Sequence, residues 1–121
     1  AEALVGLSVR ADPLLLEQAL ANLLDNALDF TPLAGEVRIE VSQSTDEMIF
    51  QVLDSGSGIP DYALPHIFDR FYSLPRSNGE KSSGLGLAFV REVARLHQGS
   101  ITLTPRAEGG VCAQLTIKNN V

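Results

Sequence analysis

A long amphipathic helix between two prolines most constrains how this chain can fold. Asp12 followed by Pro13 is a strong helix start, and Pro32 stops the helix after about Thr31. Apolar residues recur every three or four positions between them, at Leu16, Leu20, Leu23, Ala27 and Phe30. One face of this helix must therefore be buried against another layer of structure.

The same helix carries a second, polar stripe. Asn22 and Asn26 lie one turn apart, and Gln18 and Asp29 extend their stripe. Asparagine is unfavourable inside a helix, because its side chain competes for backbone hydrogen bonds. The pair indicates either a solvated face or a shared polar function beside the buried surface, and the helix alone does not separate the two.

The remaining sequence contains strand patterns on both sides of a second long helix. Strands are expected over residues 4–9, 36–41, 48–54, 100–104 and 111–117. A short helix is expected over 61–72, with Leu64, Ile67, Phe68 and Phe71 as its apolar positions. A longer helix leads from 84 to about Gln98 and is ended by Gly99; its apolar positions are Leu85, Phe89, Val93 and Leu96, with Val90 beside them.

Consecutive strand pairs favour antiparallel pairing. The predicted fold class is α+β: a two-layer sandwich with a mixed, mostly antiparallel sheet of about five strands and helices packed on one face. The 121 residues, 45% of them apolar, suffice for one domain spanning 1–121 with one core. Because the chain starts at Ala1 without Met, we expect it to be a fragment of a longer protein. Its apolar runs fall short of the roughly 20 residues that cross a bilayer, so we expect no membrane segment within these 121 residues.

Charge and cysteine content narrow the possible partners. A net charge of -6 argues against nucleic acid, because binding to its phosphate backbone needs a basic face, although it leaves room for a small polyphosphate. The single cysteine, Cys112, excludes an internal disulfide and a cysteine-cluster metal site. Its apolar neighbours indicate a small core residue.

A carboxylate on the buried side of a strand is the clearest candidate for ligand binding. Met48, Phe50 and Val52 form the apolar face of their strand, so Asp54 at its end shares that face. A buried carboxylate is costly without a partner, and the sequence offers no neighbouring cation, so a ligand donor is a reasonable partner. The glycine-punctuated segment 54–60 follows, and the polar stretch 73–83 predicts a mobile loop.

Taken together, these motifs resemble the ATP-binding catalytic domain of bacterial sensor histidine kinases, within the gyrase, Hsp90, histidine kinase and MutL superfamily. Residues 22–31 are similar to its N box, 54–58 to its first glycine box, 68–72 to its F box and 84–87 to its second glycine box. The wordings GSGIPDYALPHIF, RFYSLPR and KSSGLGLAFVREVARL resemble the CreC-type branch of these kinases. The resemblance implies the Bergerat-type ATP-binding fold, with a lid over about 72–84.

The resemblance also implies the ligands and the residues that hold them. ATP and Mg²⁺ would be bound, with Asn26 as the metal ligand, since an amide oxygen suits a hard cation. Asp54 would accept a hydrogen bond from the adenine amino group. The other implied nucleotide-binding residues are Asn22, Gly56, Gly58, Ile59, Phe68, Arg76, Lys81, Gly84, Leu85 and Gly86.

Asn22 and Arg70 are the residues implied to be catalytic. Superfamily members that hydrolyse ATP usually carry Glu at the position of Asn22, and an amide cannot act as that base. The kinase branch instead passes the γ-phosphate to a histidine on a separate dimerisation and phosphoacceptor domain, from which a response regulator receives it. His66 and His97 lack the setting of such an acceptor and are expected to be surface or capping residues, so the acceptor is expected on sequence upstream, in a cytoplasmic portion of an inner-membrane sensor kinase.

Three departures from the family pattern leave alternatives open. Asp29 replaces a frequent Lys, Ser82 replaces the first glycine of the second glycine box, and residues 111–113 lack the usual Thr and Phe. A carboxylate at position 29 would repel phosphates unless it turns to solvent or helps the metal through water. A regulatory module that binds ATP without transferring phosphate therefore remains an alternative, as does an ATPase of the same superfamily.

Overall fold

The computed structural model describes residues 11–32, 34–72 and 85–118. Its helices and strands follow in the order α1 (Pro13–Phe30), β1 (Val37–Gln43), β2 (Glu47–Asp54), the short 3₁₀ helix η2 (Leu64–His66), α2 (Gly86–Leu96), β3 (Ser100–Pro105) and β4 (Val111–Lys118). The strand predicted over 4–9 and nearly all of the predicted lid lie outside the described residues.

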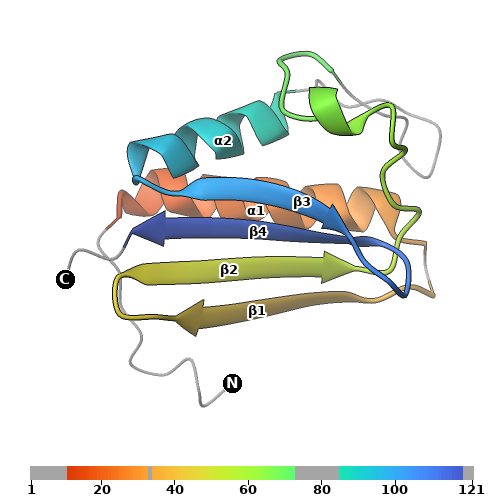
Figure 1. The fold of residues 1–121 in the computed structure, drawn as a ribbon, viewed down its shortest axis with the longest axis horizontal. Helices are drawn as coiled ribbons and strands as arrows, with labels where there is room; N and C mark the ends of the chain where they lie inside the picture. The colour runs from red at the N-terminus through yellow and green to blue at the C-terminus, as the bar shows by residue number, and fades with distance from the viewer. Residues whose placement is uncertain (1–10, 33, 73–84, 119–121) are drawn as a thin grey trace.

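The described strands form one antiparallel sheet. Its order is β1-β2-β4-β3, and every neighbouring pair is antiparallel (Figure 1). The predicted α+β sandwich is confirmed, but the described part of the sheet has four strands rather than about five, and no parallel pair.

The core lies between one face of this sheet and the two helices. Helix α1 contributes Ala19, Leu23 and Ala27, and α2 contributes Val90, Val93 and Ala94. The central strands β2 and β4 meet them with residues at every second position, namely Met48, Val52, Ala113, Leu115 and Ile117. This alternation puts Cys112, which pairs with Leu53, on the opposite face, where it is only half-buried. The expectation of a core cysteine was therefore wrong.

Helix α1 begins as its sequence predicts. The Asp12 carboxylate accepts hydrogen bonds from the backbone N–H groups of Leu14 and Leu15 at 3.0 and 3.1 Å, with Pro13 at the first helical position. The helix ends at Phe30, where Thr31 is the cap residue. The proline-bounded helix is thus confirmed at both ends.

Helix α2 differs from its prediction in its buried face and its end. Its buried face is centred on Val90, Val93 and Ala94, whereas Leu85 and Leu96 are exposed. The left-handed residue that follows the helix is Gln98, at φ 57°, and not Gly99. Gly99 is needed for a different reason: a β-carbon there would overlap the backbone carbonyl of Thr116 on β4.

The segment 61–72 is not the predicted helix. It consists of turns around η2, and Ala63 and Ile67 are its buried residues. Phe71, expected on the apolar face, is 74% exposed and has a positive φ of 68°. With three of its residues in a 3₁₀ helix, the segment follows the surface of the core in short turns.

Candidate functional site

A pocket opens where β2 ends, between α1, the glycine-rich segment after β2, the start of α2 and the β3–β4 hairpin. It is lined by Asn26, Phe30, Asp54, Gly58, Ile59, Ile67, Tyr72, Leu87, Leu103 and Val111. Most of these walls are apolar, and the polar side chains among them are few. Ligand sites of small molecules have this composition.

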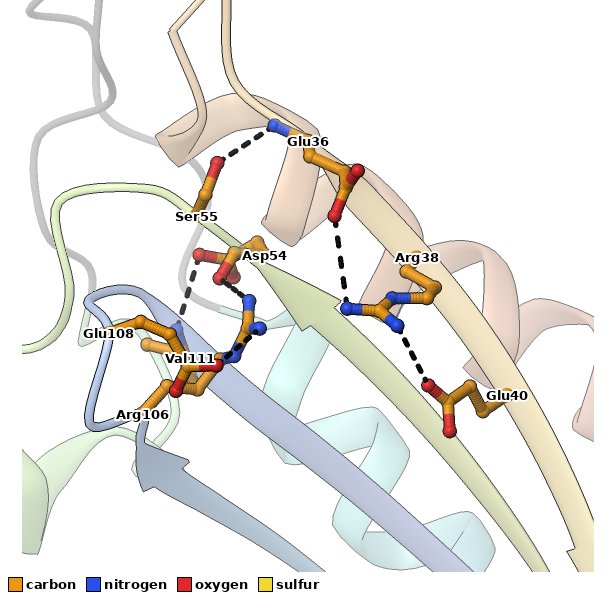
Figure 2. A network of polar contacts seen from close by, with 8 residues as sticks. All are labelled: Glu36, Arg38, Glu40, Asp54, Ser55, Arg106, Glu108 and Val111. Carbon is orange, nitrogen blue, oxygen red and sulfur yellow. Dashed lines mark hydrogen bonds and ion pairs between the residues drawn. The ribbon is translucent and has the colours of Figure 1, made fainter.

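Asp54 is the buried charged residue of this pocket, with 7% of its surface exposed. Its Oδ1 atom accepts two backbone N–H groups, one from Gly56 at 2.8 Å and one from Val111 at 3.3 Å. Figure 2 shows the contact with Val111. No hydrogen bond to its Oδ2 atom is seen within the described parts of the chain. The predicted inward orientation is correct, but half of the carboxylate is satisfied by the backbone of the chain itself.

Arg106, on the β3–β4 hairpin, contacts the backbone of Asp54. Its Nη1 atom donates to the backbone carbonyl of Asp54 at 2.7 Å, and its Nη2 atom lies 3.4 Å from the Glu108 carboxylate (Figure 2). Only 14% of the Arg106 side chain is exposed, against 72% for Glu108. The expectation that no cation lies near Asp54 is therefore wrong: Arg106 is distant in sequence but contacts the Asp54 backbone.

The two asparagines of α1 have different surroundings. Asn26 lines the pocket, whereas Asn22 does not. The Asn22 Oδ1 atom accepts the amide of Gln18 at 2.7 Å, and its Nδ2 atom donates to the carbonyl of Gly86 at 3.3 Å. Asn22 thereby joins α1 to the first residue of α2.

Other predicted site residues lie around the pocket rather than in it. Phe68 packs against the core with the Arg91 guanidinium 5.9 Å from its ring centre. Gly56 contributes its N–H to Asp54, and Gly86 its carbonyl to Asn22. The predicted residues Arg76, Lys81 and Gly84, together with Ser82, lie outside the described residues. Of the predicted set, the structure brings Asn26, Asp54, Gly58 and Ile59 into one pocket.

Arg70 lines a separate hollow beside α2. It shares this hollow with Leu85, Glu92 and Arg91, among others. A hydrogen bond from Arg95 holds the pKa of Glu92 below its usual range, and the charge of Arg70 acts in the same direction. Arg70 thus lies on the outer side of α2 and is not a wall of the pocket around Asp54.

Sequence reasoning missed several residues of the site. Sequence patterns alone do not mark the apolar walls as site residues; these are Phe30, Ile67, Tyr72, Leu87, Leu103 and Val111. Arg106 is also absent from the predicted site. Its place in the sequence, just before the turn at Gly109 and Gly110, carries no local pattern that points to Asp54.

Comparison with known proteins assigns the class. Residues 11–121 match the family described as histidine kinase-, DNA gyrase B-, and HSP90-like ATPase, so the chain belongs to that family. Within it, the chain is 61% identical over 110 residues to sensor protein CreC of Escherichia coli strain K12, a match that covers 91% of this chain and 23% of CreC. It is 43% identical to the signal transduction histidine-protein kinase AfsQ2 of Streptomyces coelicolor, over 93% of this chain and 21% of AfsQ2. The chain thus spans less than a quarter of the length of these relatives.

Solved structures agree with this class. The fold matches a mycobacterial sensor histidine kinase, MprB, with a TM-score of 0.82 at 28% identity, over 92% of this chain and 76% of that one. It also matches the catalytic domain of histidine kinase ThkA, with a TM-score of 0.81 at 29% identity, over 92% and 71% of the two chains. The chain is therefore an ATP-binding catalytic domain of the histidine kinase type. Neither helix described here is both long and apolar enough to pass through a membrane.

Proposed function

We propose that this domain binds Mg-ATP and donates the γ-phosphate to a histidine on a separate helical dimerisation domain of the same sensor kinase. An aspartate on a response regulator would then receive the phosphate. The domain would work in the cytoplasmic portion of an inner-membrane kinase.

The state of the Asp54 carboxylate carries this proposal. One of its oxygens is held by the N–H groups of Gly56 and Val111, while the other has no partner among the described residues. A buried acceptor without a partner is costly, and a ligand that donates a hydrogen bond removes this cost. The exocyclic amino group of adenine is such a donor, and the apolar walls around Asp54 suit a flat base.

Magnesium would fit this site if the nucleotide phosphates supplied some of its ligands. The described residues contain no group of three or more His, Cys, Asp or Glu side chains that could hold a metal ion. Mg²⁺ commonly uses one protein oxygen together with water and substrate phosphates, and the amide oxygen of Asn26 can supply the protein ligand. The ion would neutralise phosphate charge and keep the triphosphate in place.

The contacts of Asn22 favour transfer over hydrolysis. Its amide already bonds to Gln18 and Gly86, and an amide has no basic site with which to activate water. The two histidines of the chain are also engaged: His66 with Asp69, and His97 with Val93 and Asp12. A phosphate acceptor on another domain accords with these contacts.

A regulatory module that binds ATP without transferring phosphate is the second candidate. Asp29 favours this candidate, because it is half-buried on the same helix as Asn26, and a carboxylate near the phosphates would repel them. Radiolabelled ATP and a matching histidine-bearing domain, supplied in trans, distinguish the two. Label on the histidine supports the kinase; nucleotide binding without label supports the module; and steady hydrolysis by this domain alone would overturn both in favour of an ATPase.

A further inference from the structure

We propose that Arg106 is a positioning residue for base recognition: it fixes the backbone of Asp54 so that the carboxylate presents its second oxygen to the nucleotide base. This inference rests on the proposed function. It assigns a role to a hairpin residue that makes no contact with the base itself.

The end of the β2–β4 ladder shows why Asp54 needs this contact. Regular pairing ends at Leu53 and Cys112. Ser55 donates its backbone N–H to Glu36, on the β1 side, and alternate residues direct their backbone groups to opposite neighbours. The carbonyl of Asp54 therefore points toward β4, where Val111 would be the next ladder partner.

The regular β2–β4 pairing does not extend to Asp54 and Val111. The N–H of Val111 donates instead to the Asp54 side chain, at 3.3 Å from Oδ1. Arg106 takes the backbone carbonyl in its place, at 2.7 Å. The N–H of Val111 thus orients the Asp54 carboxylate, while the Arg106 guanidinium donates to the Asp54 backbone carbonyl, which has no partner in the regular β2–β4 pairing.

Arg106 is itself held in position by the hairpin. Its N–H donates to the carbonyl of Gly110 at 3.0 Å, and its own carbonyl accepts the N–H of Gly109 at 3.1 Å. With the side chain 14% exposed, the guanidinium approaches Asp54 from a short turn and is largely shielded from water. Charge-assisted hydrogen bonds of this kind are stronger than neutral ones, so the contact can fix the orientation of Asp54.

A role in positioning predicts more than a loss of stability. If Arg106 only tied the hairpin to β2, its removal would weaken the binding of every nucleotide alike. If it aims the Asp54 acceptor, its removal must reduce the preference for adenine over a base that lacks the 6-amino group. Hypoxanthine is such a base, since it carries a carbonyl where adenine carries the amino group.

The test measures ADP and IDP binding by calorimetry without metal, for the wild-type protein, Arg106→Gln and Arg106→Lys. We expect Arg106→Gln to weaken ADP binding about tenfold, with little change for IDP, and Arg106→Lys to retain part of the preference. Arg38→Gln is the matched control, because the Arg38 side chain on β1 is 54% exposed and pairs with Glu40 on the same strand and with Glu36 just before it (Figure 2). An ADP-to-IDP ratio that is unchanged in Arg106→Gln would overturn the inference.

A second measurement separates this inference from the proposed function. Amide NMR spectra of the nucleotide-free protein should show the Gly56 and Val111 signals displaced in Arg106→Gln and unmoved in Arg38→Gln. Displaced signals in a protein that binds no ADP would support the contact and refute the proposed function. Signals at their wild-type positions would refute the positioning role, whatever the protein binds.

Discussion

The imidazole of His97 joins the end of α2 to the start of α1: its Nε2 atom accepts the backbone N–H of Asp12 at 3.0 Å. Its Nδ1 atom lies 2.7 Å from the carbonyl of Val93, which assigns the ring proton to Nδ1. The His97 carbonyl in turn accepts the N–H of Lys118 at the end of β4. One residue thus connects both helices and a central strand.

We expect His97→Ala to lower the free energy of unfolding by about 1–3 kcal/mol, because the N–H of Asp12 and the carbonyl of Val93 both lose a partner. Urea unfolding followed by circular dichroism measures this. His66→Ala is the control: that ring is exposed, and its contacts among the described residues are local, a hydrogen bond with Asp69 and a ring contact with Tyr72, so a change within about 0.5 kcal/mol is expected. Equal effects of the two substitutions would show that the His97 contacts add no stability.

We expect Asp54→Asn to weaken ADP binding by about 10–100-fold while the fold remains intact. The amide oxygen of Asn can still accept the N–H groups of Gly56 and Val111, which leaves its NH₂ group where the acceptor for adenine should be. Calorimetry measures the binding, and Asp46→Asn, in the exposed turn between β1 and β2, is the charge-matched control. ADP affinity that is unchanged in Asp54→Asn would remove the basis for an adenine pocket here.

We expect Asn26→Ala to reduce the gain in ATP affinity that Mg²⁺ provides, because the amide oxygen that lines the pocket is lost. Titrations with an unhydrolysable ATP analogue, with and without Mg²⁺, measure that gain. Asp25→Ala, on the exposed side of the same helix turn, should leave the gain unchanged. A loss of equal size for ADP without metal would count against a magnesium role.

We expect Gly110→Ala to destabilise the fold far more than Gly109→Ala. Both glycines have a positive φ, of 87° and 101°, but a β-carbon at Gly110 would overlap the carbonyl of Asp54, whereas the space at Gly109 is open. The backbone strain common to both costs about 1 kcal/mol, and the overlap at Gly110 adds to it. Chemical denaturation compares the two, and similar losses would show that the hairpin can move away from β2 at little cost.

We expect the Cys112 thiol to react slowly with iodoacetamide at neutral pH. Burial raises the pKa of this thiol, so a smaller fraction is present as the reactive thiolate than in an unfolded chain. The rate should therefore rise at higher pH in the folded protein than in urea, and mass spectrometry can follow it because the chain has a single cysteine. Coincident pH profiles for the folded and unfolded protein would contradict this expectation.

Local patterns in the sequence predicted most of the fold. Asp12, Pro13 and Pro32 delimit α1 because caps and prolines act on the residues next to them. The alternation of Met48, Phe50 and Val52 placed Asp54 on the inner face because side chains alternate along a strand. The same rule, applied to β4, would have placed Cys112 outside, since its neighbours Val111 and Ala113 are both buried.

Contacts between distant segments could not be predicted in this way. Arg106 and Asp54 are 52 positions apart, and His97 and Asp12 are 85 apart, so no periodicity connects them. The apolar residues of 61–72 have helical spacing and predict a helix, but the same spacing also arises where a segment of turns follows the core surface. Both kinds of error concern packing that a single sequence does not encode locally.

Under the proposed function, the two ends of strand β4 serve different purposes: its first residue lies at the nucleotide site, and its last residue contacts the residue that joins the two helices. Its first residue, Val111, orients the Asp54 carboxylate, and its last, Lys118, bonds to His97, which joins the two helices. Substitutions at sites without shared contacts usually change the free energy of unfolding additively. The double variant His97→Ala/Arg106→Gln should therefore lose as much unfolding free energy as the two single variants together. The nucleotide preference of such a domain could then be altered at one end of the strand, while its thermal tolerance is adjusted at the other.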